Sequence, residues 1–135
     1  MPMRAEFFDT NVILYLLDDS AKAKTAESLL AQQGVISVQV LNETLLNCRR
    51  KAGMTWEETG RFIGGIRSLC EVYNLTPELH DLGRALAERY RFSIYDSMIV
   101  AAALMSGCSK LYSEDMQHGL RVEDTLAIVN PFLIS

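Results

Sequence analysis

The sequence lacks the patterns of several protein classes. Only three cysteines occur among 135 residues, and Cys48, Cys70 and Cys108 are widely spaced with no C-x-x-C pair. An odd, scattered set argues against a disulfide framework and against a zinc site, so we expect three reduced, buried thiols. No apolar run approaches the roughly 20 residues that span a bilayer, and residues 1–6 lack the apolar segment of a secretory signal. We therefore expect a cytoplasmic protein without a membrane partner.

The sequence also lacks an excess of basic charge. It contains 13 Lys and Arg against 17 Asp and Glu, which gives a formal net charge of -4. A generally basic surface that binds nucleic acid by neutralising phosphates is therefore not expected. The acidic excess is small, however, because setting aside the four acids discussed below leaves equal numbers of acidic and basic residues. A metal bound at those four acids would reverse the local sign of the charge.

What the chain does contain is the pattern of one α/β domain over residues 1–135. A length of 135 residues with 49% apolar residues is typical of a single domain. Short apolar segments are expected as strands at residues 4–8, 35–37, 70–73, 110–113 and 126–129. Apolar periodicity and capping signals predict helices at residues 12–17, 22–33, 38–51, 55–68, 76–90 and 95–106. Strands alternating with helices predict a three-layer sandwich, in which helices cover both faces of a parallel sheet of about five strands.

Two acids follow predicted strands. In parallel sheets, ligands bind beyond the carboxyl ends of the strands. Asp9 comes at the end of the first predicted strand, and Asp115 lies two residues past the fourth. Each also has a simpler explanation, because Asp9 could cap the next helix and Ser113-Glu114-Asp115 resembles a turn or helix cap. Glu114 competes with Asp115 for an inward position. We favour Asp115, because residue 113 should end the strand and only one of two adjacent acids readily points inward.

Two further acids occur on predicted helices. Glu43 lies opposite an apolar stripe and could be an ordinary solvent-facing residue, yet Val40 and Leu46 beside it are apolar, as in the wall of a cleft. Asp96 ends the segment Ser93-Ile94-Tyr95-Asp96, which fits the S-x-x-D form of a capping box. The helix behind Asp96 is strongly apolar and is expected to be buried, so its first turn should lie near the middle of the sheet edge.

The four acids together predict a metal site. Carboxylates that converge on one cleft repel one another strongly unless a cation joins them. A site of oxygen ligands without His or Cys suits Mg²⁺ or Mn²⁺. Such ions bind phosphate oxygens, activate a water molecule and stabilise a leaving oxygen. Asp9, Glu43, Asp96 and Asp115 are therefore predicted as metal ligands and catalytic residues of a phosphodiester hydrolase.

The residues around these acids resemble the motifs of PIN-domain nucleases, and more narrowly those of the VapC-type toxins of toxin–antitoxin pairs. The resembling segments span nearly the whole chain: Phe7-Phe8-Asp9-Thr10-Asn11-Val12, Ser37 with Glu43 six residues on, Tyr95-Asp96-Ser97, and Leu111 to Gly119. The resemblance implies a PIN-like sheet with strand order 3-2-1-4-5 and metal coordination by the four acids. It also implies that Thr10, Asn11 and Ser113 orient the carboxylates or water.

The resemblance further implies an activity and partners. It implies an Mg²⁺- or Mn²⁺-dependent ribonuclease that hydrolyses RNA with metal-activated water, forms a homodimer and is neutralised by a small antitoxin protein. A PIN-like protein that binds RNA or a protein partner without turnover would keep the same four acids, and only a cleavage assay separates it from an enzyme. A receiver-like phosphoacceptor is a weaker alternative, because it needs an Asp after the third strand, where this chain has Tyr73-Asn74-Leu75.

Overall fold

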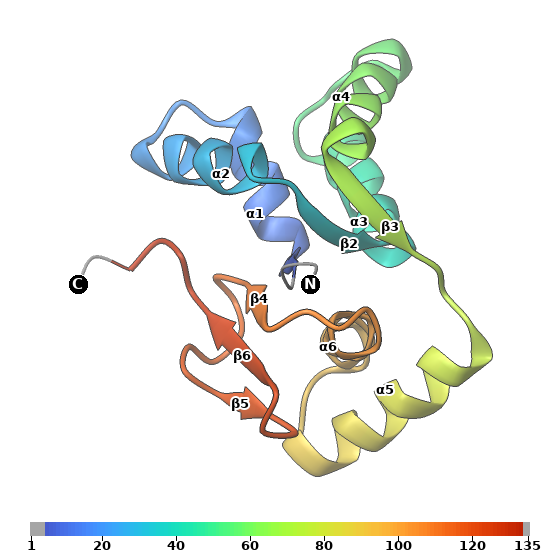
Figure 1. Cartoon of the computed structure of the whole chain (residues 1–135). Coiled ribbons are helices and arrows are strands. Elements are labelled where there is room, and N and C mark those ends of the chain that lie inside the picture. Colours follow the sequence, from blue (N-terminus) through green and yellow to red (C-terminus); the bar gives the residue numbers. More distant parts are fainter. Residues whose placement is uncertain (1–4, 134–135) are drawn as a thin grey trace.

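A computed structural model describes residues 5–133 of the chain, and its centre is a six-stranded sheet (Figure 1). The strands are β1 (Glu6–Phe8), β2 (Gly34–Ser37), β3 (Cys70–Tyr73), β4 (Lys110–Tyr112), β5 (Arg121–Val122) and β6 (Leu126–Val129). They lie in the order β3-β2-β1-β4-β6-β5. Residues 1–4 lie outside the described residues. They include Arg4, the expected first residue of β1, and most of the segment that was considered for a secretory signal.

The pairing of the strands confirms the predicted sheet and adds one strand to it. β1 is the middle strand of the parallel part and pairs with both β2 and β4, while β3 and β6 extend the sheet on either side. The expected fifth strand is β6, so the predicted order 3-2-1-4-5 holds. β5 was not predicted, and it pairs antiparallel to β6 through Arg121↔Ala127 and Val122↔Leu126.

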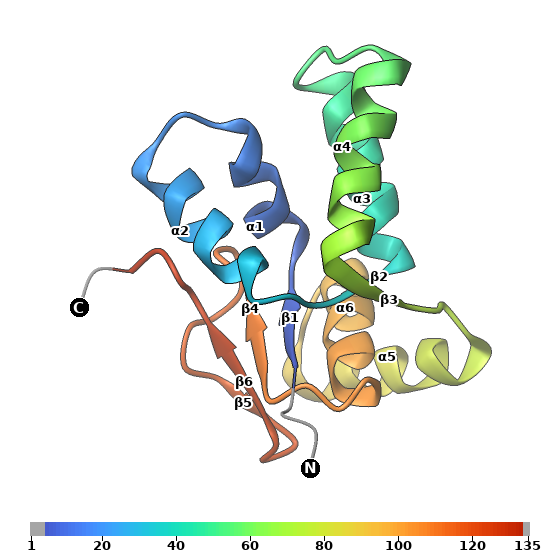
Figure 2. The ribbon, with the colours of Figure 1, turned by 45° about the horizontal axis from the view of Figure 1, so that its top comes forward.

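Helices complete the three layers. They are α1 (Thr10–Leu14), the 3-10 helix η1 (Tyr15–Leu17), α2 (Ala21–Ala31), α3 (Val38–Arg50), α4 (Trp56–Leu69), α5 (Pro77–Tyr90) and α6 (Ile94–Met105). Helices α1 and α2 lie on one side of the sheet, and α5 and α6 lie on the other (Figures 1 and 2). Helices α3 and α4 run together and project beyond the sheet (Figure 2). No helix within residues 5–133 combines the length and apolar character needed to cross a bilayer.

Local sequence signals explain most helix starts. The Thr55 side chain accepts a hydrogen bond from the Glu58 backbone N–H, and the Glu58 carboxylate accepts one from the Thr55 backbone N–H, which confirms the predicted capping box of α4. The Thr76 side chain caps α5 by accepting a hydrogen bond from the Leu79 backbone N–H, with Pro77 at the first helical position. The helix expected to continue to residue 33 instead ends at Ala31. Gln33 takes a left-handed φ of 64°, and the chain enters β2.

The core forms where α6 packs on the sheet. The middle of α6 is completely buried, as its apolar sequence predicted, and α6 packs on β2 and β4. The buried aromatic residues of β1 belong to the same core; the residues from α6 and β1 are Ile99, Val100, Ala101, Ala102, Ala103, Phe7 and Phe8. Cys48, Cys70 and Cys108 are free and buried, as expected. Burial of each large side chain contributes about 1.5–3 kcal/mol. This packing fixes the first turn of α6 beside the carboxyl ends of β1 and β4.

Candidate active site

Asp9 forms the centre of a polar cluster at the carboxyl edge of the sheet. It follows β1 directly, is 5% exposed, and caps α1 by accepting a hydrogen bond from the Thr10 backbone N–H at 2.7 Å. Ser113 Oγ donates to Asp9 Oδ2 at 2.7 Å, and Asn11 Nδ2 donates to the same oxygen at 3.2 Å. The capping explanation of Asp9 is therefore correct, but the cap uses only one of the donors that surround this carboxylate.

The environment of Asp9 disfavours its negative charge. Burial raises the pKa of Asp9 from 3.8 to about 6, although hydrogen bonds from Ser113 and Thr10 act in the opposite direction. The negative charges of Asp96 and Glu43 raise this pKa further. Three of the four predicted acids are therefore near one another in the fold. Asp9 follows β1, whereas Glu43 is on α3 and Asp96 is on α6.

Glu43 points to the same cluster from the second turn of α3. The Thr10 hydroxyl donates to Glu43 Oε1 at 2.7 Å, and Gln39 Nε2 donates to Glu43 Oε2 at 3.0 Å. Gln39 Nε2 also donates to the carbonyl oxygen of Tyr95 at 2.8 Å, so it links α3 to the first turn of α6. Gln39 was not predicted as a site residue, although its position four residues before Glu43 on a helix is a usable signal.

The apolar neighbours of Glu43 differ from one another. Val40 is completely buried, while Leu46 is 47% exposed. These exposures do not test the expected cleft wall beside Glu43, which stays a prediction. Leu46 belongs to the exposed face of α3, whereas Thr44 and Cys48 on either side of it in the sequence are buried.

Asp96 occupies the first turn of α6. Its backbone N–H donates to Ser93 Oγ at 3.2 Å, so the serine half of the expected capping box is present. Burial raises the pKa of Asp96, and the charges of Glu43 and Asp115 raise it further, while the Ser93 hydrogen bond lowers it. Asp96 is therefore influenced by the negative charge of Glu43 on α3 and by that of Asp115 after β4.

The two adjacent acids after β4 have different surroundings. Asp115 Oδ2 accepts a hydrogen bond from Asn11 Nδ2 at 3.1 Å, and this amide also contacts Asp9. Glu114 Oε1 instead accepts a hydrogen bond from the Tyr15 hydroxyl at 2.6 Å, and Lys22 binds its other oxygen. Ser113, completely buried, donates to Asp9 and accepts from the backbone N–H of Asp115 at 3.3 Å. Asp115 therefore contacts the amide that also contacts Asp9, whereas Glu114 contacts Tyr15 and Lys22, and the choice of Asp115 as the metal ligand stays a prediction.

The chemistry of these side chains suits a hard divalent cation. The donors are carboxylate oxygens supported by hydroxyl and amide groups, and burial together with the negative charge of neighbouring acids raises the pKa of Asp9 and that of Asp96. Within residues 5–133, no three His, Cys, Asp or Glu side chains are arranged so that they could hold one metal ion as they stand. The support for a metal is therefore the type of donor and the mutual repulsion of the acids.

Comparison with known proteins identifies the family. The PIN domain family matches residues 7–119, which include all four predicted acids. The chain belongs to the PIN domain family. Among curated proteins, no sequence matches the chain significantly.

Solved structures share the fold of this PIN domain. A toxin–antitoxin complex from Klebsiella pneumoniae contains a chain that is 19% identical, with a TM-score of 0.75 over 96% of this chain and 100% of that one. The VapC20 toxin of Mycobacterium tuberculosis, described as cleaving the sarcin-ricin loop, is 22% identical, with a TM-score of 0.62 over 82% of this chain and 90% of that one. A DNA-bound VapBC complex from Salmonella typhimurium is 20% identical, with a TM-score of 0.68 over 93% and 97%.

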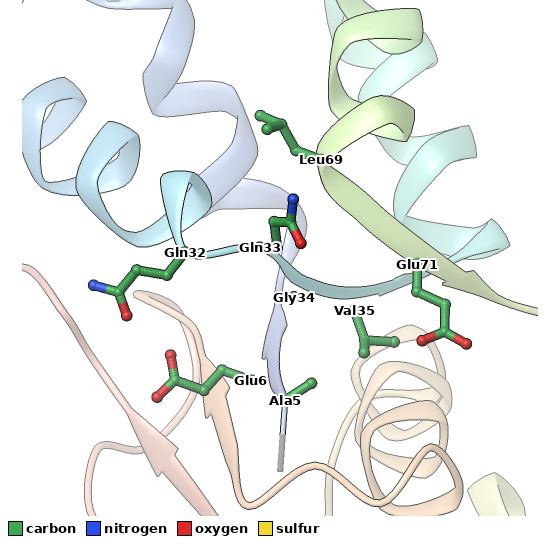
Figure 3. A pocket seen from close by; sticks show the side chains of 8 residues that line it. All are labelled: Ala5, Glu6, Gln32, Gln33, Gly34, Val35, Leu69 and Glu71. Carbon is green, nitrogen blue, oxygen red and sulfur yellow. The ribbon is translucent and has the colours of Figure 1, made fainter. Parts of the chain in front are cut away.

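Cavities occur at the amino ends of the strands and, separately, beside α1 and η1. One of about 360 Å³ lies at the amino ends of β1, β2 and β3, where Glu6, Gln32 and Glu71 extend around it, and it contains none of the four acids (Figure 3). Another, of about 320 Å³, is lined by Asn11, Leu14, Tyr15 and Asp18. It adjoins a third of about 250 Å³, because the two share Leu14 and Asp18, and the third also includes Lys51. Neither of these two cavities is lined by any of the four acids, although Asn11, which contacts Asp9 and Asp115, lines one of them.

Two other polar features of this PIN domain have structural roles. His118 is exposed, and its Nδ1 accepts a hydrogen bond from the Asn130 backbone N–H at 2.9 Å, which fastens the segment after β6. Arg49 Nη1 donates to the carbonyl oxygen of Met54 at 2.6 Å, and its guanidinium lies 4.3 Å from the centroid of the Trp56 ring. These contacts stabilise the turn between α3 and α4.

Proposed function

We propose that this PIN domain is a divalent-metal-dependent ribonuclease that acts as the toxin of a toxin–antitoxin pair. The observation that carries the proposal is the network of hydrogen bonds in which Thr10 and Asn11 connect Asp9, Glu43 and Asp115, which come from three separate segments. Asp96, in the first turn of α6, is near enough that its negative charge contributes to the raised pKa of Asp9. Family membership supports nuclease chemistry at this site. Like charges gathered around the buried Asp9 are destabilising, so their accumulation is best explained by a cation that neutralises them during function.

The four acids share one role in the proposed site, and three neighbouring side chains support them. Mg²⁺ or Mn²⁺ would be held by Asp9, Glu43, Asp96 and Asp115. The ion would lower the pKa of a bound water, so that hydroxide is available to attack phosphorus, and it would stabilise the negative charge on the leaving oxygen. Thr10, Asn11 and Ser113 donate hydrogen bonds to these carboxylates and so fix their orientation. Donors in such positions typically contribute 10–100-fold to metal affinity or activity.

The proposed partners follow from the related structures. One related chain is from a toxin–antitoxin complex and another is described as cleaving the sarcin-ricin loop, so an antitoxin protein and an RNA substrate are proposed here. We also propose a homodimer in the cytoplasm, where RNA and a reducing environment are present. Three free, buried cysteines are compatible with that compartment.

A cleavage assay with Asp96→Asn tests the proposed activity. Incubation of total RNA with the parent protein in Mg²⁺ or Mn²⁺ should produce defined cleavage ends, and chelation should stop the reaction. Asp96→Asn should reduce the rate about a hundredfold or more, because even the partners of metal ligands contribute 10–100-fold. Asp81→Asn is the matched control, since Asp81 is exposed on α5, and it should cleave at the parental rate.

The possible results separate three explanations. Cleavage by Asp96→Asn at the parental rate would show that the assigned site is wrong. Metal binding by the parent without any cleavage would identify a catalytically silent module that binds RNA or protein. Cleavage that stops when the protein encoded by the gene immediately upstream is added would support the toxin–antitoxin assignment.

A further inference from the structure

Three side chains, Lys22, Tyr15 and Glu114, form a hydrogen-bonded cluster beside the proposed site. Lys22 on α2 donates hydrogen bonds to Glu114 Oε2 and, at 3.2 Å, to the Tyr15 hydroxyl. The hydroxyl of Tyr15, in η1, donates to Glu114 Oε1 at 2.6 Å. Both oxygens of Glu114 are therefore occupied by groups that lie about a hundred residues away in the sequence. We call Lys22, Tyr15 and Glu114 the anchor cluster.

The anchor cluster is more protected than an ordinary surface ion pair. The Glu114 side chain is 24% exposed and that of Lys22 is 44% exposed. The Lys22 ammonium lies 5.0 Å from the centroid of the Tyr15 ring and 5.7 Å from that of Phe132, and these two rings pack edge to face at 4.7 Å. Rings on one side and a carboxylate on the other restrict Lys22 to this position.

The backbone of Glu114 transmits this restraint to the site. Its N–H donates to Asn11 Oδ1 at 3.1 Å. The other end of the same amide, Asn11 Nδ2, donates to Asp115 at 3.1 Å and to Asp9 at 3.2 Å. A shift of residue 114 would therefore change the position of Asp115 directly and the position of Asn11 through one hydrogen bond.

We propose that Lys22 and Tyr15 are positioning residues which, by binding Glu114, exclude that carboxylate from the metal site and hold Asp115 in it. This inference rests on the proposed function, because it takes Asp115 as the working acid. The need for such a device follows from the sequence, in which Glu114 and Asp115 are adjacent and equally able to bind a cation. A released Glu114 would add a fifth negative charge beside four acids that already repel one another.

Lys22→Met tests the proposal, with Lys24→Met as the matched control. Met keeps an unbranched apolar chain but removes the charge, and Lys24 is an exposed lysine two residues further along α2. Lys22→Met should weaken Mn²⁺ binding, measured by calorimetry, by about tenfold. It should lower kcat at limiting metal and leave KM for RNA unchanged. In the metal-free protein, it should shift the NMR signals of the Asn11 side-chain amide. Lys24→Met should change none of these.

Two further variants show whether Lys22 acts through Glu114. Lys22→Met combined with Glu114→Gln should recover most of the lost Mn²⁺ affinity, because the uncompensated carboxylate is gone. Tyr15→Phe, which keeps the ring packed on Phe132, should reproduce part of the Lys22→Met effect. It serves as the test if circular dichroism shows that Lys22→Met does not fold.

The results distinguish this inference from others. If Lys22 contacts RNA phosphate instead, Lys22→Met would raise KM for RNA and reduce the salt dependence of RNA binding. The Mn²⁺ affinity and the NMR signals of the Asn11 amide would then stay unchanged, and this outcome would overturn the proposal. A parent protein that binds Mn²⁺ but cleaves no RNA would refute the proposed function, while the Mn²⁺ and NMR measurements would still decide the role of the anchor cluster. A parent protein that binds no Mn²⁺ would overturn both.

Discussion

Replacement of Asp9 by Asn should stabilise the metal-free protein at neutral and alkaline pH. The pKa of Asp9 is 3.8 in its ordinary environment and about 6 in the folded protein, mainly because the side chain is buried. A tenfold change in proton affinity corresponds to about 1.4 kcal/mol, so this rise corresponds to a destabilisation of about 3 kcal/mol when the carboxylate is charged. The opposing hydrogen bonds from Ser113 and Thr10 are already included in that pKa.

The sign of the pH dependence follows from proton binding. Between about pH 4 and pH 6 the folded state binds more protons at Asp9 than the unfolded state does, so this residue makes stability fall as pH rises through that range. Below pH 4 the side chain is neutral in both states, and above pH 6 the full penalty is present. Asp9→Asn should therefore match the parent near pH 4 and exceed its free energy of unfolding by about 2–3 kcal/mol at pH 8.

Urea denaturation with a chelator present measures this difference. Free energies of unfolding at pH 4, 5, 6 and 8 should diverge in the stated direction for Asp9→Asn, while Asp81→Asn should follow the parent throughout. Saturating Mn²⁺ should then stabilise the parent and have little effect on Asp9→Asn, since ligands stabilise only the state that binds them. A constant difference between Asp9→Asn and the parent across this pH range would refute the reasoning.

Two other substitutions have outcomes that the structure determines. Gly34→Ala should lower the free energy of unfolding by about 1–3 kcal/mol in urea denaturation, because its Cβ would lie 2.6 Å from the carbonyl oxygen of Glu6. Gly60→Ala on α4 is the control: its Cβ would meet no atom within 4 Å, so this substitution should be neutral or stabilising. Ser113→Ala removes the donor to Asp9 and should lower the RNA cleavage rate about 10–100-fold, with partial recovery in Ser113→Thr; an unchanged rate would contradict the role assigned to this hydroxyl.

Features set by neighbouring residues were predictable from the sequence. The start of α4 follows from Thr55 and Glu58, and that of α5 follows from Thr76 and Pro77. The position of Asp9 at the sheet edge follows from its place after an apolar strand. These predictions succeed because hydrogen bonds and burial within a few residues determine the structure there. The strand order was predicted from the family resemblance rather than from local signals.

Features set by distant contacts were not predictable in this way. β5 contains only two residues, and its pairing depends on a turn in which Glu123 and Asp124 take positive φ values of 51° and 57°. Neither residue is glycine, so the turn has no strong sequence signal. The partners of Glu114 lie 92 and 99 residues away, and no local pattern indicates them. The surroundings that distinguish Glu114 from Asp115 became visible only in the folded chain.

The order in which the strands occur along the chain has a consequence for protein synthesis. β1 is made first, but its partner β4 lies at Lys110–Tyr112, and Ser113 and Asp115 follow it. A nascent chain that ends at α6 would leave one edge of β1 without its neighbour and Asp9 without the Ser113 hydroxyl. A fragment that lacks β4 and the segment to Asp115 is therefore expected to be inactive, and the proposed nuclease becomes competent only after this segment has left the ribosome and folded.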